Sequence, residues 1–122
     1  MIRLLLFGLF SAVILTLNSC YYDNEEDLYP GTFCDTANVN YSGEIDAIIQ
    51  GKCATPGCHV SGGDGSGDFT VFSELAEKTA SGVLLRSVQR LPGAIPMPPD
   101  GPLRDCEIRQ IELWVADGFP NN

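Results

Sequence analysis

Basic side chains and histidine are scarce in this chain of 122 residues. Seven lysines and arginines stand against sixteen aspartates and glutamates, so the formal net charge is −9, and there is one histidine. A protein that binds nucleic acid needs a basic surface to neutralise phosphates, and this composition provides none. The same charge opposes electrostatic adhesion to anionic lipid. We therefore expect no nucleic-acid partner, and any membrane attachment must depend on hydrophobic groups.

Long hydrophobic runs are absent except near the N-terminus. Residues 4–17 are almost wholly apolar and follow Arg3, a pattern typical of a secretory signal and too short to cross a bilayer comfortably. The run closes at Leu-Asn-Ser-Cys, which resembles a bacterial lipobox, where the cysteine becomes the acylated N-terminus. We predict a signal peptide at 1–19, lipidation of Cys20 and an acidic tether at 20–33. The alternative is an ordinary secretory signal in which Cys20 has no role.

The stretch CATPGCH carries the most distinctive chemistry of the chain. Two cysteines followed directly by a histidine are the pattern that attaches a c-type haem. Each thiol can add across a porphyrin vinyl group to form a thioether, and the histidine can ligate the iron. Four residues separate Cys53 from Cys58, where two are usual, and Pro56-Gly57 can turn outward so that both thiols face one porphyrin edge. The stretch predicts haem attachment at Cys53 and Cys58, with His59 as an axial ligand.

A proline-rich segment at 91–102 holds the one methionine that remains after removal of the signal peptide. Regular structure is excluded there because five prolines interrupt it. Met97 stands between two of these prolines, and a thioether sulfur suits haem iron on the side opposite histidine. Taken alone, a single methionine is more often core filling. Beside a haem motif, Met97 is predicted to be the second axial ligand.

The five cysteines can all be assigned. Cys20 is assigned to lipid, and Cys53 and Cys58 to haem, which leaves Cys34 and Cys106. In an oxidising compartment the default for one remaining pair is a disulfide. The competing interpretation makes one member of this pair a metal ligand.

Helical spacing of apolar residues predicts a mainly α domain at 34–122. Ser42 and Asp105 are the predicted N-caps of the first and last helices, and Gly51 and Gly118 the predicted stops. Trp114 is expected to anchor the core. The expected helices cover residues 42–51, 71–78, 83–90 and 105–117. A glycine-rich loop at 60–68 lacks the pattern of a phosphate or calcium loop, so we expect it to carry the chain around the haem edge.

The segment 34–122 resembles the small class I-like cytochrome c domains of exported lipoproteins in Bacteroidetes and related bacteria. The resemblance rests on the CDT start, CATPGCH, the MPPDG loop and the closing WVADG. It implies short helices wrapped round one haem c per chain. By position it implies thioethers at Cys53 and Cys58, His59 as the proximal ligand and Met97 as the distal ligand. The wide cysteine spacing departs from the commonest cytochrome pattern.

The sequence therefore predicts an electron carrier rather than an enzyme. With both axial positions filled the iron would offer no site to a substrate, and a cytochrome peroxidase would require a second haem motif. The expected partners are redox proteins, and the expected location is a periplasmic membrane face or the outer-membrane surface. Two alternatives stay open. One is a lipoprotein that binds zinc through Cys53, Cys58 and His59 with help from Cys34 or Cys106. The other is a disulfide-stapled domain without a cofactor.

Overall fold

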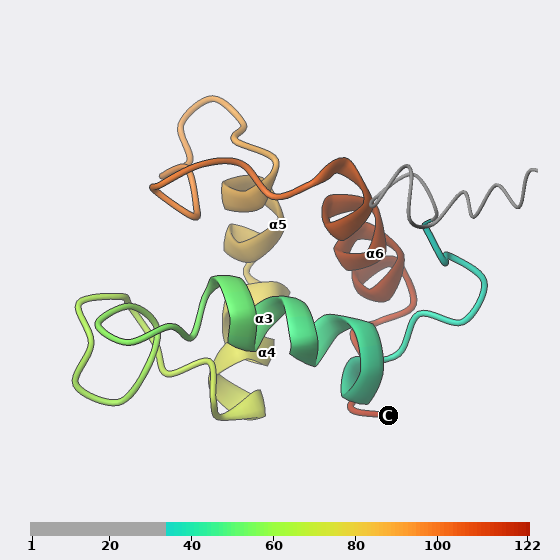
Figure 1. The fold of residues 1–122 in the computed structure, drawn as a ribbon, viewed down its shortest axis with the longest axis horizontal. Helices are drawn as coiled ribbons and strands as arrows, with labels where there is room; N and C mark the ends of the chain where they lie inside the picture. Colours follow the sequence, from blue (N-terminus) through green and yellow to red (C-terminus); the bar gives the residue numbers. More distant parts are fainter. Residues whose placement is uncertain (1–33) are drawn as a thin grey trace, which may run out of the picture. The chain divides into compact units, whose positions relative to one another are not determined.

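Every regular element in residues 34–122 is helical, and this segment contains no strand (Figure 1). The structure, a computed structural model, describes these residues. The helices are η1 (Tyr41–Ile45), α3 (Asp46–Lys52), α4 (Phe72–Ala80), α5 (Val83–Val88) and α6 (Asp105–Ala116). The prediction of a mainly α fold is confirmed for this segment. The predicted signal peptide at 1–19, the lipidation site Cys20 and the tether at 20–33 lie outside the described residues.

The first helical segment is a π-helical turn, η1, that continues directly into α3. Its N-cap is Asn40, whose side-chain oxygen accepts a hydrogen bond from the N–H of Gly43 at 2.8 Å. The predicted N-cap, Ser42, is wrong, because this residue lies inside the turn and its hydroxyl donates to Asn40 at 3.1 Å. The wider π turn begins earlier than an α-helical turn would, so the cap falls two residues upstream. The predicted stop at Gly51 is also wrong, because α3 continues to Lys52.

Helices α4 and α5 follow one another with a short turn between them. Gly82 makes this turn with φ of 72°, a conformation that a residue without Cβ adopts easily. Both helices were expected from their apolar spacing, and both differ from prediction by only one or two residues at an end. Helix α5 stops at Val88 instead of near Arg90, whose φ of 55° is outside the helical region.

The N-cap of helix α6 lies one residue before the predicted N-cap. Asp105, the predicted N-cap, is the first helical residue, and Arg104 precedes it in an extended conformation. The carboxylate of Glu107 accepts the backbone N–H of Arg104 at 2.8 Å and a guanidinium N–H at 3.0 Å. This carboxylate therefore satisfies the chain at the helix start, and the side chain of Asp105 is not needed as a cap. Gly118, with φ of 89°, follows the helix end as predicted.

The core lies where α6 packs on η1 and α5. Trp114 is fully buried, as predicted, and its indole N–H donates to the carbonyl of Pro120 at 3.0 Å. Tyr41 packs its ring edge against Phe72 at a centroid distance of 4.7 Å. Burying each large apolar side chain contributes roughly 1.5–3 kcal/mol before the entropy cost of folding. The buried apolar residues are Ile45, Ile48, Ile49, Cys53, Phe69, Leu75, Leu84, Val88, Leu103, Ile111 and Trp114.

Two links join distant parts of the described chain. Cys34 and Cys106 form a disulfide, which is the pairing that the cysteine count predicts. At the other end, the carbonyl of Asn122 accepts the N–H of Ser42 at 2.9 Å, and its side chain accepts the N–H of Tyr41 at 2.9 Å. The disulfide joins the segment before η1 to the first turn of α6, and the Asn122 bonds bring the end of the chain against η1. Among residues 34–122, no helix has the length and apolar character that crossing a membrane requires.

Candidate cofactor site

The stretch CATPGCH folds into a closed turn directly after α3. The N–H groups of Cys53 and Ala54 donate to the carbonyl of Ile49, at 2.9 and 2.8 Å, and so hold the first cysteine at the helix end. The N–H of His59 then donates back to the carbonyl of Cys53 at 3.1 Å. Gly57, with φ of 84°, provides the reversal that this bond requires. The four residues between the cysteines therefore loop out, and the two ends of the motif stay together.

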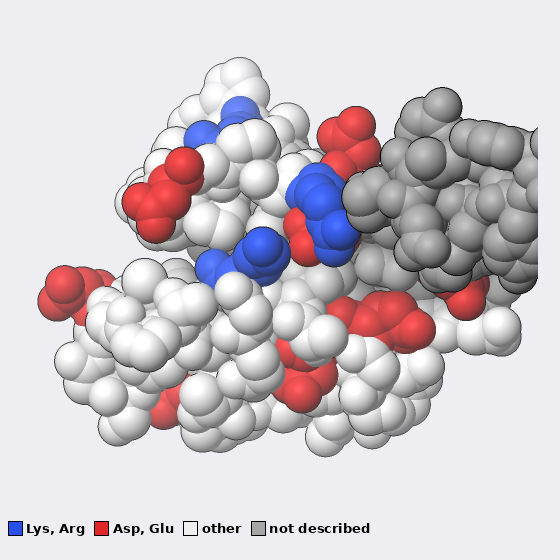
Figure 2. Space-filling model, viewed as in Figure 1, with Lys and Arg blue, Asp and Glu red and all other residues white. Residues whose placement is uncertain are grey.

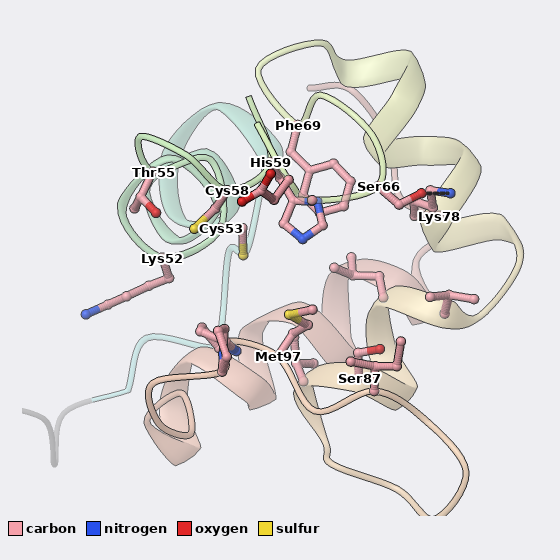
Figure 3. A pocket seen from close by; sticks show the side chains of 18 of the residues that line it. Lys52, Cys53, Thr55, Cys58, His59, Ser66, Phe69, Lys78, Ser87 and Met97 are labelled. Atoms are coloured by element: carbon pink, nitrogen blue, oxygen red, sulfur yellow. Dashed lines mark hydrogen bonds between the residues drawn. The ribbon is translucent and has the colours of Figure 1, made fainter. Parts of the chain in front are cut away.

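The two thiols of this turn line one cavity and are free of disulfide bonds. Figure 3 shows both sulfur atoms at the same side of the cavity. Cys53 is buried and Cys58 is half-buried. Burial raises the pKa of the Cys53 thiol to about 11, and the Glu107 carboxylate and the Cys58 thiol add to this effect. Cys53 is therefore protonated at neutral pH, whereas binding a metal ion would require its thiolate.

His59 lines the same cavity, and the side chain of Phe69 lies flat against its imidazole. The two ring centroids are 4.1 Å apart and the ring planes differ by 5°. The Nδ1 atom of His59 is buried and has no hydrogen-bond partner. A buried polar atom without a partner is costly, so packing must hold the ring in place.

Met97 approaches the cavity from the opposite side. Its segment is fastened to the end of α5, because the N–H of Met97 donates to the carbonyl of Ser87 at 3.1 Å. The guanidinium of Arg90 adds a second bond, to the carbonyl of Pro98 at 2.6 Å. Figure 3 shows Met97 facing His59 across the cavity, with Cys53 toward one edge. The structure thus brings together the four residues that the sequence singled out.

The cavity between these residues has a volume of about 600 Å³. This value lies within the range of roughly 300–1,000 Å³ that is typical of cofactor and small-molecule sites. Leu84, Val88 and Ile95 give it apolar walls, and the side chains of Lys52 and Lys78 also reach it. Figure 2 shows the molecular surface hollowed between the loop after α5 and the loop after α3, with basic side chains at the inner end of the hollow. The site is open to solvent along this side.

Three features of the site are absent from the sequence prediction. The first is the stacking of Phe69 on His59. The 60–68 loop was expected only to connect, yet a Cβ at Gly65 would lie 2.7 Å from the Nδ1 atom of His59. Burial of Glu107 next to Cys53 was not expected either. The abundance of glycine in the loop is a signal of close backbone approach, but the sequence does not say to which group.

The zinc alternative loses its additional ligands in this structure. It required a ligand from Cys34 or Cys106, and the disulfide occupies both. Within residues 34–122, no group of three or more histidine, cysteine, aspartate or glutamate side chains is arranged to hold a metal ion. The donor set at the cavity is two thiols, one imidazole and one thioether, which is the chemistry of a covalently held haem.

Comparison of this chain with models of known protein families, with curated proteins and with solved structures finds no match.

Proposed function

We propose that this chain is a c-type cytochrome that carries one electron between redox proteins outside the cytoplasmic membrane. In this proposal Cys53 and Cys58 hold one haem through thioethers. His59 and Met97 are the axial ligands. When bound, the haem supplies a reversible one-electron change at iron.

One observation carries the proposal. Cys53, Cys58 and His59 come from the turn after α3, and Met97 comes from the proline-rich loop after α5, yet all four line one cavity. Histidine and methionine lie on opposite sides of it (Figure 3). Chain connectivity alone keeps the two thiols and the histidine together, but it does not require Met97 of a separate loop to join them, whereas a haem site requires such a fourth residue.

The other residues of the cavity have supporting roles. Leu84 and Val88 exclude water from one wall. The bonds from Met97 to Ser87 and from Arg90 to Pro98 hold the methionine segment in position. A ligand that is already held in position loses less conformational entropy on binding iron. With both axial positions filled the site leaves no coordination position for a substrate, which favours electron transfer over catalysis.

The proposed location and partners follow from the N-terminal sequence. A lipid on Cys20 would anchor the chain at a periplasmic membrane face or at the outer-membrane surface. Redox proteins would then be its electron donors and acceptors. The disulfide at Cys34 and Cys106 agrees with an oxidising compartment.

The test is a spectrum after acid–acetone extraction. The protein is produced with its export signal in a host that has the cytochrome c maturation machinery. We expect haem to stay with the protein and to show c-type bands that sharpen on reduction. A matched variant, Cys53→Ser with Cys58→Ser, should release its haem on extraction. A colourless wild-type protein, with stoichiometric zinc or with no metal, would contradict the proposal.

A further inference from the structure

The glycine-rich loop after CATPGCH returns to the histidine from which it starts. The N–H of Gly65 donates to the carbonyl of Cys58 at 3.2 Å, and the N–H of Phe69 donates to the carbonyl of His59 at 2.9 Å. These two bonds fix the middle of the loop and the residue that follows it to consecutive carbonyl groups. Gly65 and Phe69 are therefore held against the imidazole of His59 by the backbone itself.

Phe69 sets the plane of the imidazole. Its ring lies parallel to that of His59, with centroids 4.1 Å apart and planes within 5°. The phenyl ring is itself buried among core residues, with 5% of its surface exposed. A ring this deeply buried has little freedom to shift, so it presents a fixed surface to the histidine.

Gly65 lies against a face of the imidazole. A Cβ placed on this residue would lie 2.7 Å from Nδ1 and 2.8 Å from Cγ of His59. The φ of Gly65 lies outside the left-handed region, so the backbone does not by itself require glycine. The requirement comes from the close approach of the imidazole ring, which leaves no room for a side chain.

The Nδ1 atom of His59 lies inside this arrangement, buried and without a hydrogen-bond partner. A metal-bound histidine almost always donates its second ring N–H to a carbonyl or carboxylate, which orients the ring and makes the ligand more basic. Here such a bond is missing, and two packing contacts take its place. Nε2 is therefore the ring nitrogen that is available to bind a ligand in the cavity.

We infer that Gly65 and Phe69 are positioning residues that clamp His59 with its Nε2 toward the cavity. This inference rests on the proposed haem function. It assigns a role to the 60–68 loop, which orients His59 by packing. In other proteins a hydrogen bond to the second ring nitrogen usually orients such a ligand.

The first experiment adds one methyl group at Gly65. Gly65→Ala and the control Gly51→Ala are produced with the cytochrome c maturation machinery, as is the wild-type protein. Gly51 is a matched control because a Cβ there meets no atom within 4 Å and its φ is also outside the left-handed region. Covalent haem content, electron paramagnetic resonance of the oxidised protein and the reduction potential are measured.

We expect Gly65→Ala to keep covalent haem, because both cysteines are untouched, and to lose the low-spin signal of a histidine- and methionine-ligated iron. Gly51→Ala should match the wild-type protein in all three measurements. A Gly65→Ala protein with the wild-type signal and potential would overturn the clamp and leave the haem proposal standing. A wild-type protein without covalent haem would overturn both.

The second experiment removes the stacked ring and decides the question if Gly65→Ala does not accumulate. Phe69→Leu is compared with Phe72→Leu, which also removes a core aromatic ring, one that packs on Tyr41 and does not line the cavity. The expected result is a shift of the low-spin g-values and of the reduction potential in Phe69→Leu alone. Equal shifts in the two variants, or none in Phe69→Leu, would show that Phe69 has no positioning role.

Discussion

Glu107 keeps its charge although its side chain is only 5% exposed. Burial alone would raise the pKa of this carboxyl. Hydrogen bonds from the backbone N–H and guanidinium of Arg104, with the charges of Arg104 and Lys52, outweigh that effect and hold the pKa below its ordinary value of 4.5. A group with a lowered pKa in the folded state stabilises the protein above its unfolded pKa and loses this contribution as the pH falls through the folded value.

The first prediction concerns Glu107→Gln. At pH 7 the variant should be less stable by about 1 kcal/mol, because two charge-assisted hydrogen bonds become neutral ones. The difference should shrink as the pH falls below 4.5, because the unfolded wild-type chain then takes up a proton, and it should vanish once the folded carboxyl is protonated at lower pH. Urea unfolding at pH 7, 5 and 3 measures it. A constant difference at all three values would count against the charge-based explanation.

The second prediction concerns Met97→Ala. If Met97 ligates the haem iron, its loss should lower the reduction potential and open the iron to carbon monoxide, since methionine ligation raises the potential. The control is Leu91→Ala at the start of the same loop, where the residue is 42% exposed and does not line the cavity. Potentiometry and carbon monoxide difference spectra of the two variants decide the assignment. An unchanged potential in Met97→Ala would falsify it.

At the residue scale, the sequence predicted four residues that line one cavity, but not the contacts that support them. Cys53, Cys58, His59 and Met97 were found because such residues are rare here and their spacing has chemical meaning. The stacking of Phe69 and the burial of Glu107 were not found. Both depend on contacts that form only when separate segments pack together, and no local pattern encodes them.

At the scale of secondary-structure elements, the N-cap of η1 can be tested directly. The third prediction is that Asn40→Ala destabilises the domain by about 1 kcal/mol, because the N–H of Gly43 loses its side-chain acceptor. Ser42→Ala is the matched control and should cost less, since the Ser42 hydroxyl donates to Asn40 and caps no backbone group. The midpoints of urea unfolding compare the two variants. A larger loss in Ser42→Ala would restore that residue as the cap.

The existence of the four expected helical segments was predictable, and their ends were less so. Apolar residues at helical spacing, such as Ile45, Ile48 and Ile49, mark a buried face whatever the exact boundary. The caps are set by small differences between neighbouring polar groups. The position of the first cap also depends on Asn122, at the far end of the chain, because its carbonyl accepts the backbone N–H of Ser42. A local sequence window cannot include that contact.

At the scale of the whole molecule, the disulfide is the strongest cross-link. It joins residues separated by 72 positions, so the chain-entropy model gives it a contribution of roughly 4 kcal/mol. The fourth prediction is that Cys34→Ser with Cys106→Ser lowers the unfolding free energy by about this amount. Reduction of the wild-type protein should produce the same loss, and the double variant should not respond to reductant. Equal unfolding midpoints with and without reductant would contradict the cross-link.

The contact of Asn122 with Tyr41 and Ser42 brings the last residue beside the first helical turn. In a chain reduced to residues 41–122, a short linker could therefore join Asn122 to Tyr41, and new ends could be opened at an exposed loop position. A break at Gly93, which is exposed, would make the Met97 segment part of the new N-terminal arm. Met97 would then lie near the new N-terminus, whereas Cys53, Cys58 and His59 would follow the linker in the C-terminal part of the permuted chain.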